Sequence, residues 1–168
     1  MAQVLIALGS NLGDRFRALQ TAVEAMARHF YLEQLSPVYE TKPAYVLDQP
    51  KFLNCACRVT TEKAPKQVLT LLQGIEQQLG RYPAQRYGPR LIDLDILFYD
   101  QLVLDQPDLR IPHPLLRERA FVLVPLGDIV PDWIHPETGE KIATLRDHCA
   151  DLDSTIKPYP QLLDFPAP

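Results

Sequence analysis

The stretch Gly88-Pro-Arg-Leu-Ile-Asp-Leu-Asp-Ile96 carries two carboxylates inside a segment that otherwise has the character of a buried strand. Because side chains alternate along a strand, Asp93 and Asp95 are expected to share one face. Their Cα atoms would then lie roughly 6.5 Å apart. The opposite, apolar face is expected to comprise Ile92, Leu94, Ile96 and Phe98.

Two neighbouring negative charges in an apolar segment need a compensating cation or contact with water. Mg²⁺ shared by Asp93 and Asp95 is the simplest cation. Arg90 precedes the pair, and a metal beside an arginine suits a polyphosphate. A solvated strand face without function is the alternative interpretation. The flanking Gly-Pro-Arg and the apolar continuation favour a site.

The composition fits one soluble globular domain, with 168 residues of which 46% are hydrophobic and 23% charged. We expect this domain to span residues 1–160 and a loose, proline-rich tail to follow at 161–168. The net charge of −4 argues against nucleic-acid or anionic-membrane partners. Three cysteines, an odd number, argue for a reducing compartment, and no membrane span or signal peptide is visible. The expected location is cytoplasmic.

Apolar periodicity predicts alternating strands and helices up to the Asp-x-Asp strand. Pro37 suggests an edge or a bulge in the second strand, and a basic loop at 81–89 precedes the last one. Recurrent prolines after Gln101 predict short helices joined by turns. The expected elements are strands at 4–8, 31–39, 52–60 and 92–98 and helices at 14–28 and 64–79.

This order is the βαββαβ pattern of a ferredoxin-like α+β fold, with an antiparallel sheet and both helices on one face. The other face would be available for a site. On the third strand, Phe52 and Asn54 share a face and could join the aspartates there. An aromatic ring beside a carboxamide suits a flat heterocycle, although an ordinary half-buried strand has the same pattern.

Arginine supplies every cationic side chain between residues 81 and 119. Its planar fork fits phosphate oxygens, although at least half of these arginines are expected in surface salt bridges. His113, held between two prolines, is either a packed or turn-capping residue or a phosphate donor. Gly9-Ser-Asn-Leu-Gly13 is interpreted as a strand-to-helix turn, since it lacks the lysine of a P-loop.

These residues resemble the 6-hydroxymethyl-7,8-dihydropterin pyrophosphokinase family of the folate pathway. The Gly88–Ile96 stretch is similar to the family signature, and further similarities follow in the right order along nearly the whole chain. They are Gly9-Ser-Asn-Leu, Tyr39-Glu-Thr, Gln49-Pro-Lys-Phe-Leu-Asn54, Ile75-Glu76, Gly80-Arg81, Ile111-Pro-His-Pro114 and Arg119-Ala-Phe121. The family fold is ferredoxin-like, in agreement with the element order.

The resemblance implies a monomeric, ATP-dependent transferase. In the reaction that the resemblance implies, the pterin hydroxyl would attack the β-phosphorus of ATP, pyrophosphate would be transferred and AMP would leave. Asp93 and Asp95 would hold two Mg²⁺ ions, and Arg81 and Arg90 would act in catalysis. The residues that match ATP-contacting positions are Gln73, Glu76, Arg81, Arg90, Arg110, His113 and Arg119. Those that match the pterin pocket are Thr41, Lys42, Pro43, Ala44, Phe52, Asn54, Asp93 and Phe121.

Some positions depart from the family pattern. Tyr87 replaces a tryptophan found in some relatives, and Asp108 stands where some have an arginine, with Arg110 two residues later. Such changes should alter loop motion and turnover more than the type of reaction. The alternative functions are another Mg²⁺-dependent nucleotidyl- or phosphotransferase with an Asp-x-Asp motif, or a non-catalytic protein that binds nucleotide or pterin.

Overall fold

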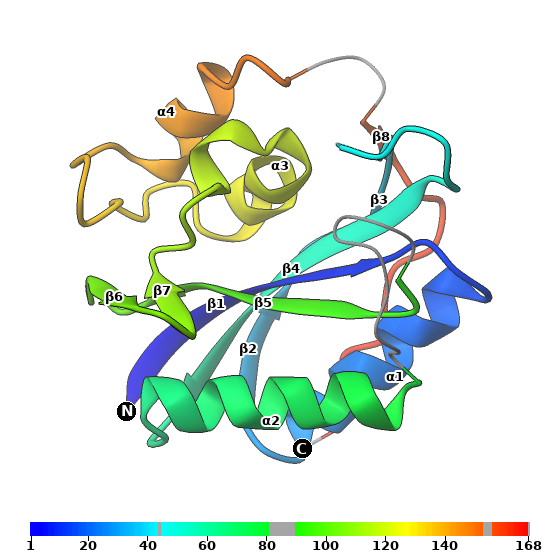
Figure 1. Ribbon diagram of the computed structural model, residues 1–168, viewed down its shortest axis with the longest axis horizontal. Coiled ribbons are helices and arrows are strands. Elements are labelled where there is room, and N and C mark those ends of the chain that lie inside the picture. Colours follow the sequence, from blue (N-terminus) through cyan, green and yellow to red (C-terminus); the bar gives the residue numbers. More distant parts are fainter. Residues whose placement is uncertain (44, 81–89, 153–155, 168) are drawn as a thin grey trace.

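A βαββαβ core with an antiparallel sheet occupies the chain up to Tyr99 and confirms the predicted ferredoxin-like fold (Figure 1). The structure is a computed structural model that describes residues 1–43, 45–80, 90–152 and 156–167. The elements of the core are β1 (Ala2–Ser10), α1 (Arg15–Ala27), β2 (Tyr31–Leu35), β3 (Tyr39–Thr41), β4 (Phe52–Thr61), α2 (Pro65–Gln78) and β5 (Asp93–Tyr99).

The sheet runs in the order β5-β1-β4-β3-β8, and β2 also pairs with β4. The short strand β8 (Lys157–Pro158) pairs with β3. Strands β2 and β3 together form the second strand of the core, which is interrupted at Pro37, where the sequence predicted an edge or a bulge.

Ser36 maintains the sheet at this interruption. Its backbone N–H donates to the carbonyl of Ala56 (2.9 Å), and its Oγ accepts the N–H of Ala56 (2.8 Å). The hydroxyl in turn donates to the carbonyl of Pro37 (2.8 Å). A side chain therefore satisfies a buried backbone donor where the ladder is broken.

The two helices begin and end close to the predicted positions. The side chain of Asp14 caps α1 by accepting the N–H of Arg17 (3.1 Å). Pro65 lies in the first turn of α2, and the Gln67 side chain accepts the N–H of Ala64 (2.8 Å). Both helices pack their apolar stripes on the same face of the sheet, over the first of two cores (Figure 1).

The sequence predicted that the opposite face of the sheet would be available for a site. A second core covers part of this face, so only the rest of it is open. This core is formed by α3 (Ala120–Ile129) and α4 (Ile142–Asp147), which lie across the sheet from α1 and α2 (Figure 1). Before them come the hairpin of β6 (Leu104–Gln106) and β7 (Leu109–Ile111), which the sequence did not predict, and the 3-10 helix η1 (Leu116–Glu118). The predicted short helices of this region are confirmed.

One face assignment on β5 was wrong. Leu94 and Ile96 pack into the first core beneath the helices, as predicted, but Phe98 belongs to the second core, together with Leu97. The β1–β5 register shifts between Leu5 and Ile6, opposite this point. Such a bulge breaks the alternation of faces and turns Phe98 toward α3 and α4.

The C-terminal segment runs back over β3 and α1 (Figure 1). Tyr159 donates its N–H to the carbonyl of Val38 (2.8 Å), and its ring stacks on Phe16 with 5.9 Å between centroids. Further on, Gln20 and the backbone of Asp164 exchange two hydrogen bonds (3.1 and 2.8 Å). Residues 161–167 form neither helix nor strand, and Asp164 among them is hydrogen-bonded to α1.

None of the helices in the described ranges is both long and apolar enough to cross a bilayer.

The Ser36 contacts predict a specific stability loss. Ser36→Ala leaves the N–H of the fully buried Ala56 without its acceptor, so the free energy of unfolding should fall by about 1–3 kcal/mol. Chemical denaturation measures this change. Thr70→Ala, which removes a hydroxyl from the exposed side of α2, should alter it by less than about 0.5 kcal/mol. Equal effects of the two substitutions would contradict the role of Ser36.

Candidate active site

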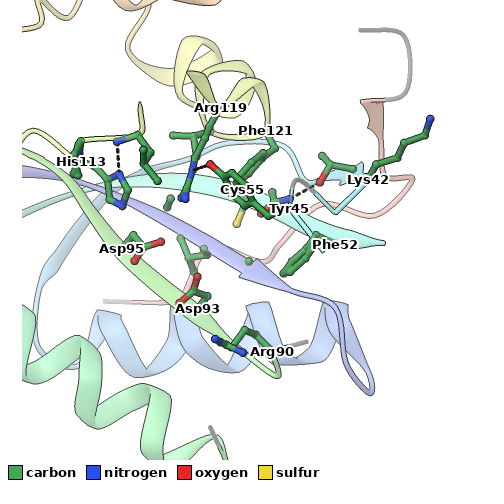
Figure 2. Close-up of a pocket in the computed structure, with 18 residues that line it drawn as sticks. Lys42, Tyr45, Phe52, Cys55, Arg90, Asp93, Asp95, His113, Arg119 and Phe121 are labelled. Carbon is green, nitrogen blue, oxygen red and sulfur yellow. Dashed lines mark hydrogen bonds between the residues drawn. The ribbon is translucent and has the colours of Figure 1, made fainter. Parts of the chain in front are cut away.

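A cavity of about 390 Å³ opens on the part of the second sheet face that α3 leaves uncovered (Figure 2). Its walls come from β1, β4, β5 and α3, from the end of β3 and the segment after it, and from the segments that precede β5 and α3. The lining residues are Ala7, Leu8, Gly9, Thr41, Lys42, Tyr45, Phe52, Asn54, Cys55, Arg90, Asp93, Asp95, His113, Pro114, Leu115, Arg119, Phe121 and Val122.

The register of the sheet sets the floor of this cavity. Gly9 of β1 lies opposite Asp93 on one side and Asn54 on the other. In the next row, Ala7 lies between Asp95 and Ala56. A Cβ at Gly9 would come within 2.8 Å of Asn54 Oδ1, so glycine is required for this close approach. Because Gly9 and Ala7 have little or no side chain, space remains above this part of the sheet for a ligand.

Asp93 and Asp95 both enter the cavity from β5, as the alternation predicted (Figure 2). Both are half-buried. The described residues contain no cluster of three or more potential metal-ligating side chains, so the aspartates are a two-carboxylate set. Their hard oxygens fit Mg²⁺, which commonly keeps several waters and binds substrate phosphates beside one or two carboxylates. The two carboxylates therefore suit a Mg²⁺ ion whose other ligands are water and the oxygens of a bound polyphosphate.

His113 is fixed by its own backbone surroundings. Its N–H donates to the carbonyl of Leu97 (3.0 Å), and its Nδ1 accepts the N–H of Leu115 (3.2 Å). Burial and, to a smaller extent, the positive charge of Arg119 lower the pKa of His113 to about 4, although the negative charge of Asp93 opposes this shift. The imidazole is therefore neutral near pH 7, with its proton on Nε2, which can donate to a ligand.

Arg119, just before α3, is directed into the cavity beside Tyr45 (Figure 2). Its guanidinium carbon lies 5.3 Å from the centroid of the Tyr45 ring and 5.6 Å from that of Phe121. Both distances are within the range of cation–π attraction. Arg90 enters from the segment before β5, so two arginines and His113 lie around the aspartates (Figure 2).

The other end of the cavity combines aromatic and amide groups. Phe52 comes from β4 and Phe121 from α3, as the strand parity and the resemblance predicted. In the same lining, the buried Asn54 donates its Nδ2 to Thr41 Oγ1 (2.7 Å). The Asn54 carboxamide is thereby held in one orientation, which suits recognition of the edge of a flat heterocycle.

Asn11 connects the two ends of the site, and the sequence did not reveal this role. Its Oδ1 accepts the N–H of Arg90 (2.8 Å), and its own N–H donates to the carbonyl of Arg90 (3.0 Å). Its Nδ2 donates to Gln49 Oε1 (3.0 Å) and to the carbonyl of Pro50 (2.9 Å). The Gly9–Gly13 turn, predicted as a strand-to-helix connection, therefore also links Arg90 to the segment before β4 through the hydrogen bonds of Asn11.

Three predicted nucleotide-binding residues do not line the cavity. Gln73 is exposed on α2. Glu76 is buried, and its Oε2 accepts the N–H of Leu94 (2.9 Å) at the outer side of the edge strand β5. Arg110 forms an exposed salt bridge with Asp105 (3.1 Å) on the β6–β7 hairpin. Their roles in ATP binding stay predictions.

Of three further predicted site residues, one lies outside the cavity lining and two lie outside the described residues. Pro43 does not line the cavity, although its neighbour Lys42 does. Ala44 and Arg81 lie outside the described residues, together with the rest of the predicted basic loop at 81–89. Tyr45 and Gly9 line the cavity but were not among the predicted site residues. The glycine was visible in the Gly9–Gly13 motif, whereas no pattern pointed to Tyr45.

Comparison with known proteins agrees with this geometry. Residues 5–131 match the family model described as 7,8-dihydro-6-hydroxymethylpterin-pyrophosphokinase (HPPK). The chain is 44% identical over 133 residues to the folic acid synthesis protein FOL1 of Dictyostelium discoideum, and the match covers 79% of this chain and 20% of the relative. The chain thus spans about a fifth of the length of that relative.

A bacterial relative is matched along most of its length. The chain is 42% identical over 149 residues to the 2-amino-4-hydroxy-6-hydroxymethyldihydropteridine pyrophosphokinase of Pseudomonas aeruginosa, with 88% of this chain and 91% of the relative covered. In structure, the chain resembles a crystal structure of Plasmodium falciparum HPPK-DHPS (TM-score 0.75, 16% identity), with 94% of this chain and 48% of that chain covered. This last likeness concerns the fold alone. From the family model and the bacterial relative we conclude that the chain belongs to the 7,8-dihydro-6-hydroxymethylpterin-pyrophosphokinase family.

Proposed function

We propose that the chain transfers pyrophosphate from ATP to the hydroxyl of 6-hydroxymethyl-7,8-dihydropterin in folate biosynthesis and releases AMP. One observation carries the proposal: the Asp93–Asp95 pair opens into the same cavity as the Asn54–Thr41 amide pocket. A polyphosphate at the acidic end and a flat heterocycle at the amide end would therefore meet. The names of the matched relatives support the same reaction.

The pterin end orients the attacking group. Phe52 and Phe121 offer two aromatic faces for stacking, and Asn54 and Thr41 offer donors and acceptors for the edge of the ring. Lys42 contributes a further wall, and the resemblance assigns Pro43 and Ala44 to pterin binding as well. Held in this way, the hydroxymethyl group would face the phosphates, and this orientation removes much of the entropy cost of the reaction.

The acidic end binds the triphosphate. Asp93 and Asp95 would hold two Mg²⁺ ions, which when bound supply charge neutralisation and Lewis acidity. Arg90 and Arg119 would contact phosphate oxygens through their planar forks, and neutral His113 would donate from Nε2. The resemblance also assigns Gln73, Glu76, Arg81 and Arg110 to ATP binding, and Arg81 and Arg90 to catalysis, and these roles remain part of the proposal.

We also propose that the protein acts as a monomer in the cytoplasm, with the pyrophosphokinase domain at 1–160. Its substrates would be the only partners that the reaction needs.

Product analysis tests the proposed reaction. The purified protein with Mg²⁺, ATP and 6-hydroxymethyl-7,8-dihydropterin should form AMP and the pterin diphosphate in equal amounts, and no AMP when the pterin is omitted. Release of pyrophosphate or ADP instead would indicate a nucleotidyl- or phosphotransferase. Binding of both ligands without any product would indicate a binding protein.

The acidic pair predicts the effect of neutralising one carboxylate. Asp95→Asn keeps the shape of the side chain but removes a metal-binding charge, so turnover should fall about a thousandfold while the melting temperature is unchanged. Electron paramagnetic resonance of Mn²⁺ with a non-hydrolysable ATP analogue should also show weaker binding of the metal. Asp132→Asn, at an exposed salt bridge with Lys141, is the matched control. Near-normal turnover at saturating Mg²⁺ would remove the metal role.

The aromatic pair predicts a change that is selective for one substrate. Phe121→Ala should raise the dissociation constant for the pterin about tenfold, because stacking area is lost, and alter that for ATP less than about threefold. Fluorescence titration with the pterin and calorimetry with an ATP analogue measure the two constants. Phe165→Ala, at an exposed ring near the C-terminal end, serves as the control. An unchanged pterin titration would refute stacking on Phe121.

The burial of His113 predicts a dependence on pH. In metal-free, ligand-free protein the imidazole should titrate near pH 4, which NMR of ¹³C-labelled histidine measures. Between this value and the ordinary pKa of about 6.5, the unfolded chain binds more protons than the folded protein. The contribution of His113 should therefore lower the free energy of unfolding as pH falls through this window. A titration midpoint above pH 6 would contradict this assignment.

A further inference from the structure

We propose that Tyr45 is a positioning residue that holds Arg119 in the orientation needed to bind a phosphate group, and so connects the pterin end of the cavity to its phosphate end. This inference deepens the proposed function and rests on it. Tyr45 follows β3 in the segment that leads to β4, whereas Arg119 immediately precedes α3. The two residues are 74 positions apart in the chain and meet at the cavity.

Three contacts join the tyrosine to the arginine and its neighbour. Arg119 donates its Nε to the Tyr45 hydroxyl oxygen (3.2 Å), and that hydroxyl donates to Glu118 Oε1 (3.4 Å). The guanidinium also lies over the Tyr45 ring (Figure 2). On the other side of Arg119, Phe121 offers a second ring. The guanidinium is therefore restrained by one hydrogen bond and by two aromatic contacts.

The hydrogen bond at Nε decides how the guanidinium can meet a phosphate. With Nε bonded to Tyr45, the edge formed by Nη1 and Nη2 is the one directed to a ligand. This edge can donate two parallel hydrogen bonds to two oxygens of one phosphate. A flexible arginine would lose rotamer freedom on binding, and the contacts with Tyr45 reduce this cost before ATP arrives.

The segment that carries Tyr45 is itself anchored near the second arginine of the site. Gln49 donates to the carbonyl of Val46 (2.6 Å) and accepts from Asn11, which also holds the backbone of Arg90. The same segment thus contacts Arg119 through Tyr45 and the Arg90 region through Asn11.

A double-mutant cycle tests the proposal. The four proteins are the wild type, Tyr45→Phe, Arg119→Ala and the double variant, and calorimetry measures the dissociation constant for α,β-methylene ATP with Mg²⁺. Tyr45→Phe keeps the ring and removes only the hydroxyl. It should weaken binding about threefold when Arg119 is present and leave it unchanged when Arg119 is absent, because the lost hydrogen bond is partly exposed. The KM for the pterin should stay within about twofold.

Tyr31→Phe is the matched control. It removes a hydroxyl from a tyrosine that is 63% exposed on β2, away from the cavity lining, and should change neither constant. Melting temperatures of all variants separate a loss of folding from a loss of positioning. Should Tyr45→Phe lower the melting temperature, the pterin constant measured on the same sample identifies general damage, since general damage would weaken both ligands.

Several results would overturn the proposal. Equal weakening with and without Arg119, or no weakening in either background, would mean that Tyr45 does not act through Arg119. Loss of pterin affinity alone would make Tyr45 a pterin contact instead. The wild-type product assay tests the proposed reaction separately: no AMP from the wild type, together with coupling in the ATP-analogue cycle, would reject the reaction and keep the positioning role.

Discussion

The pairing of β1 with β4 on one side and β5 on the other is the constraint on which the site depends. It sets Asp93, Gly9 and Asn54 in one row across the sheet. The acidic group and the amide group are thus two strand spacings apart, roughly 10 Å. A slip of one residue in either pairing would turn the aspartates or Asn54 into the first core. The pairing register therefore decides which side chains line the cavity.

The seven residues of strand β5 contribute side chains to both cores and to the cavity. Near its start, Leu94 packs under the helices while its outward N–H is bonded to the buried carboxylate of Glu76. Near its end, the bulge directs Leu97 and Phe98 to α3 and α4. Asp93 and Asp95, on either side of Leu94 in the sequence, are half-buried on the cavity side of the strand. Packing at both ends of the strand holds the two carboxylates in place although they repel each other.

The sequence predicted the features that follow a simple period or a local signal. Alternation placed Asp93, Asp95, Phe52 and Asn54 on one face because these strands are long and apolar on the other. The same alternation failed at Phe98, since nothing in the local pattern marks the bulge. The contacts of Asn11 and Tyr45 could not be predicted, because their partners lie 38 to 79 residues away and meet them only in the folded chain.

The two-residue strand β8 has a consequence for self-association. It covers the outer edge of β3, where Tyr39 pairs with Pro158 and Glu40 with Lys157. An uncovered edge offers unpaired N–H and C=O groups to any other strand, including one from a second copy. Proline lacks the N–H donor with which a further strand would pair, and a lysine side chain beside it disfavours docking. The C-terminal segment thereby protects this side of the sheet from edge-to-edge aggregation.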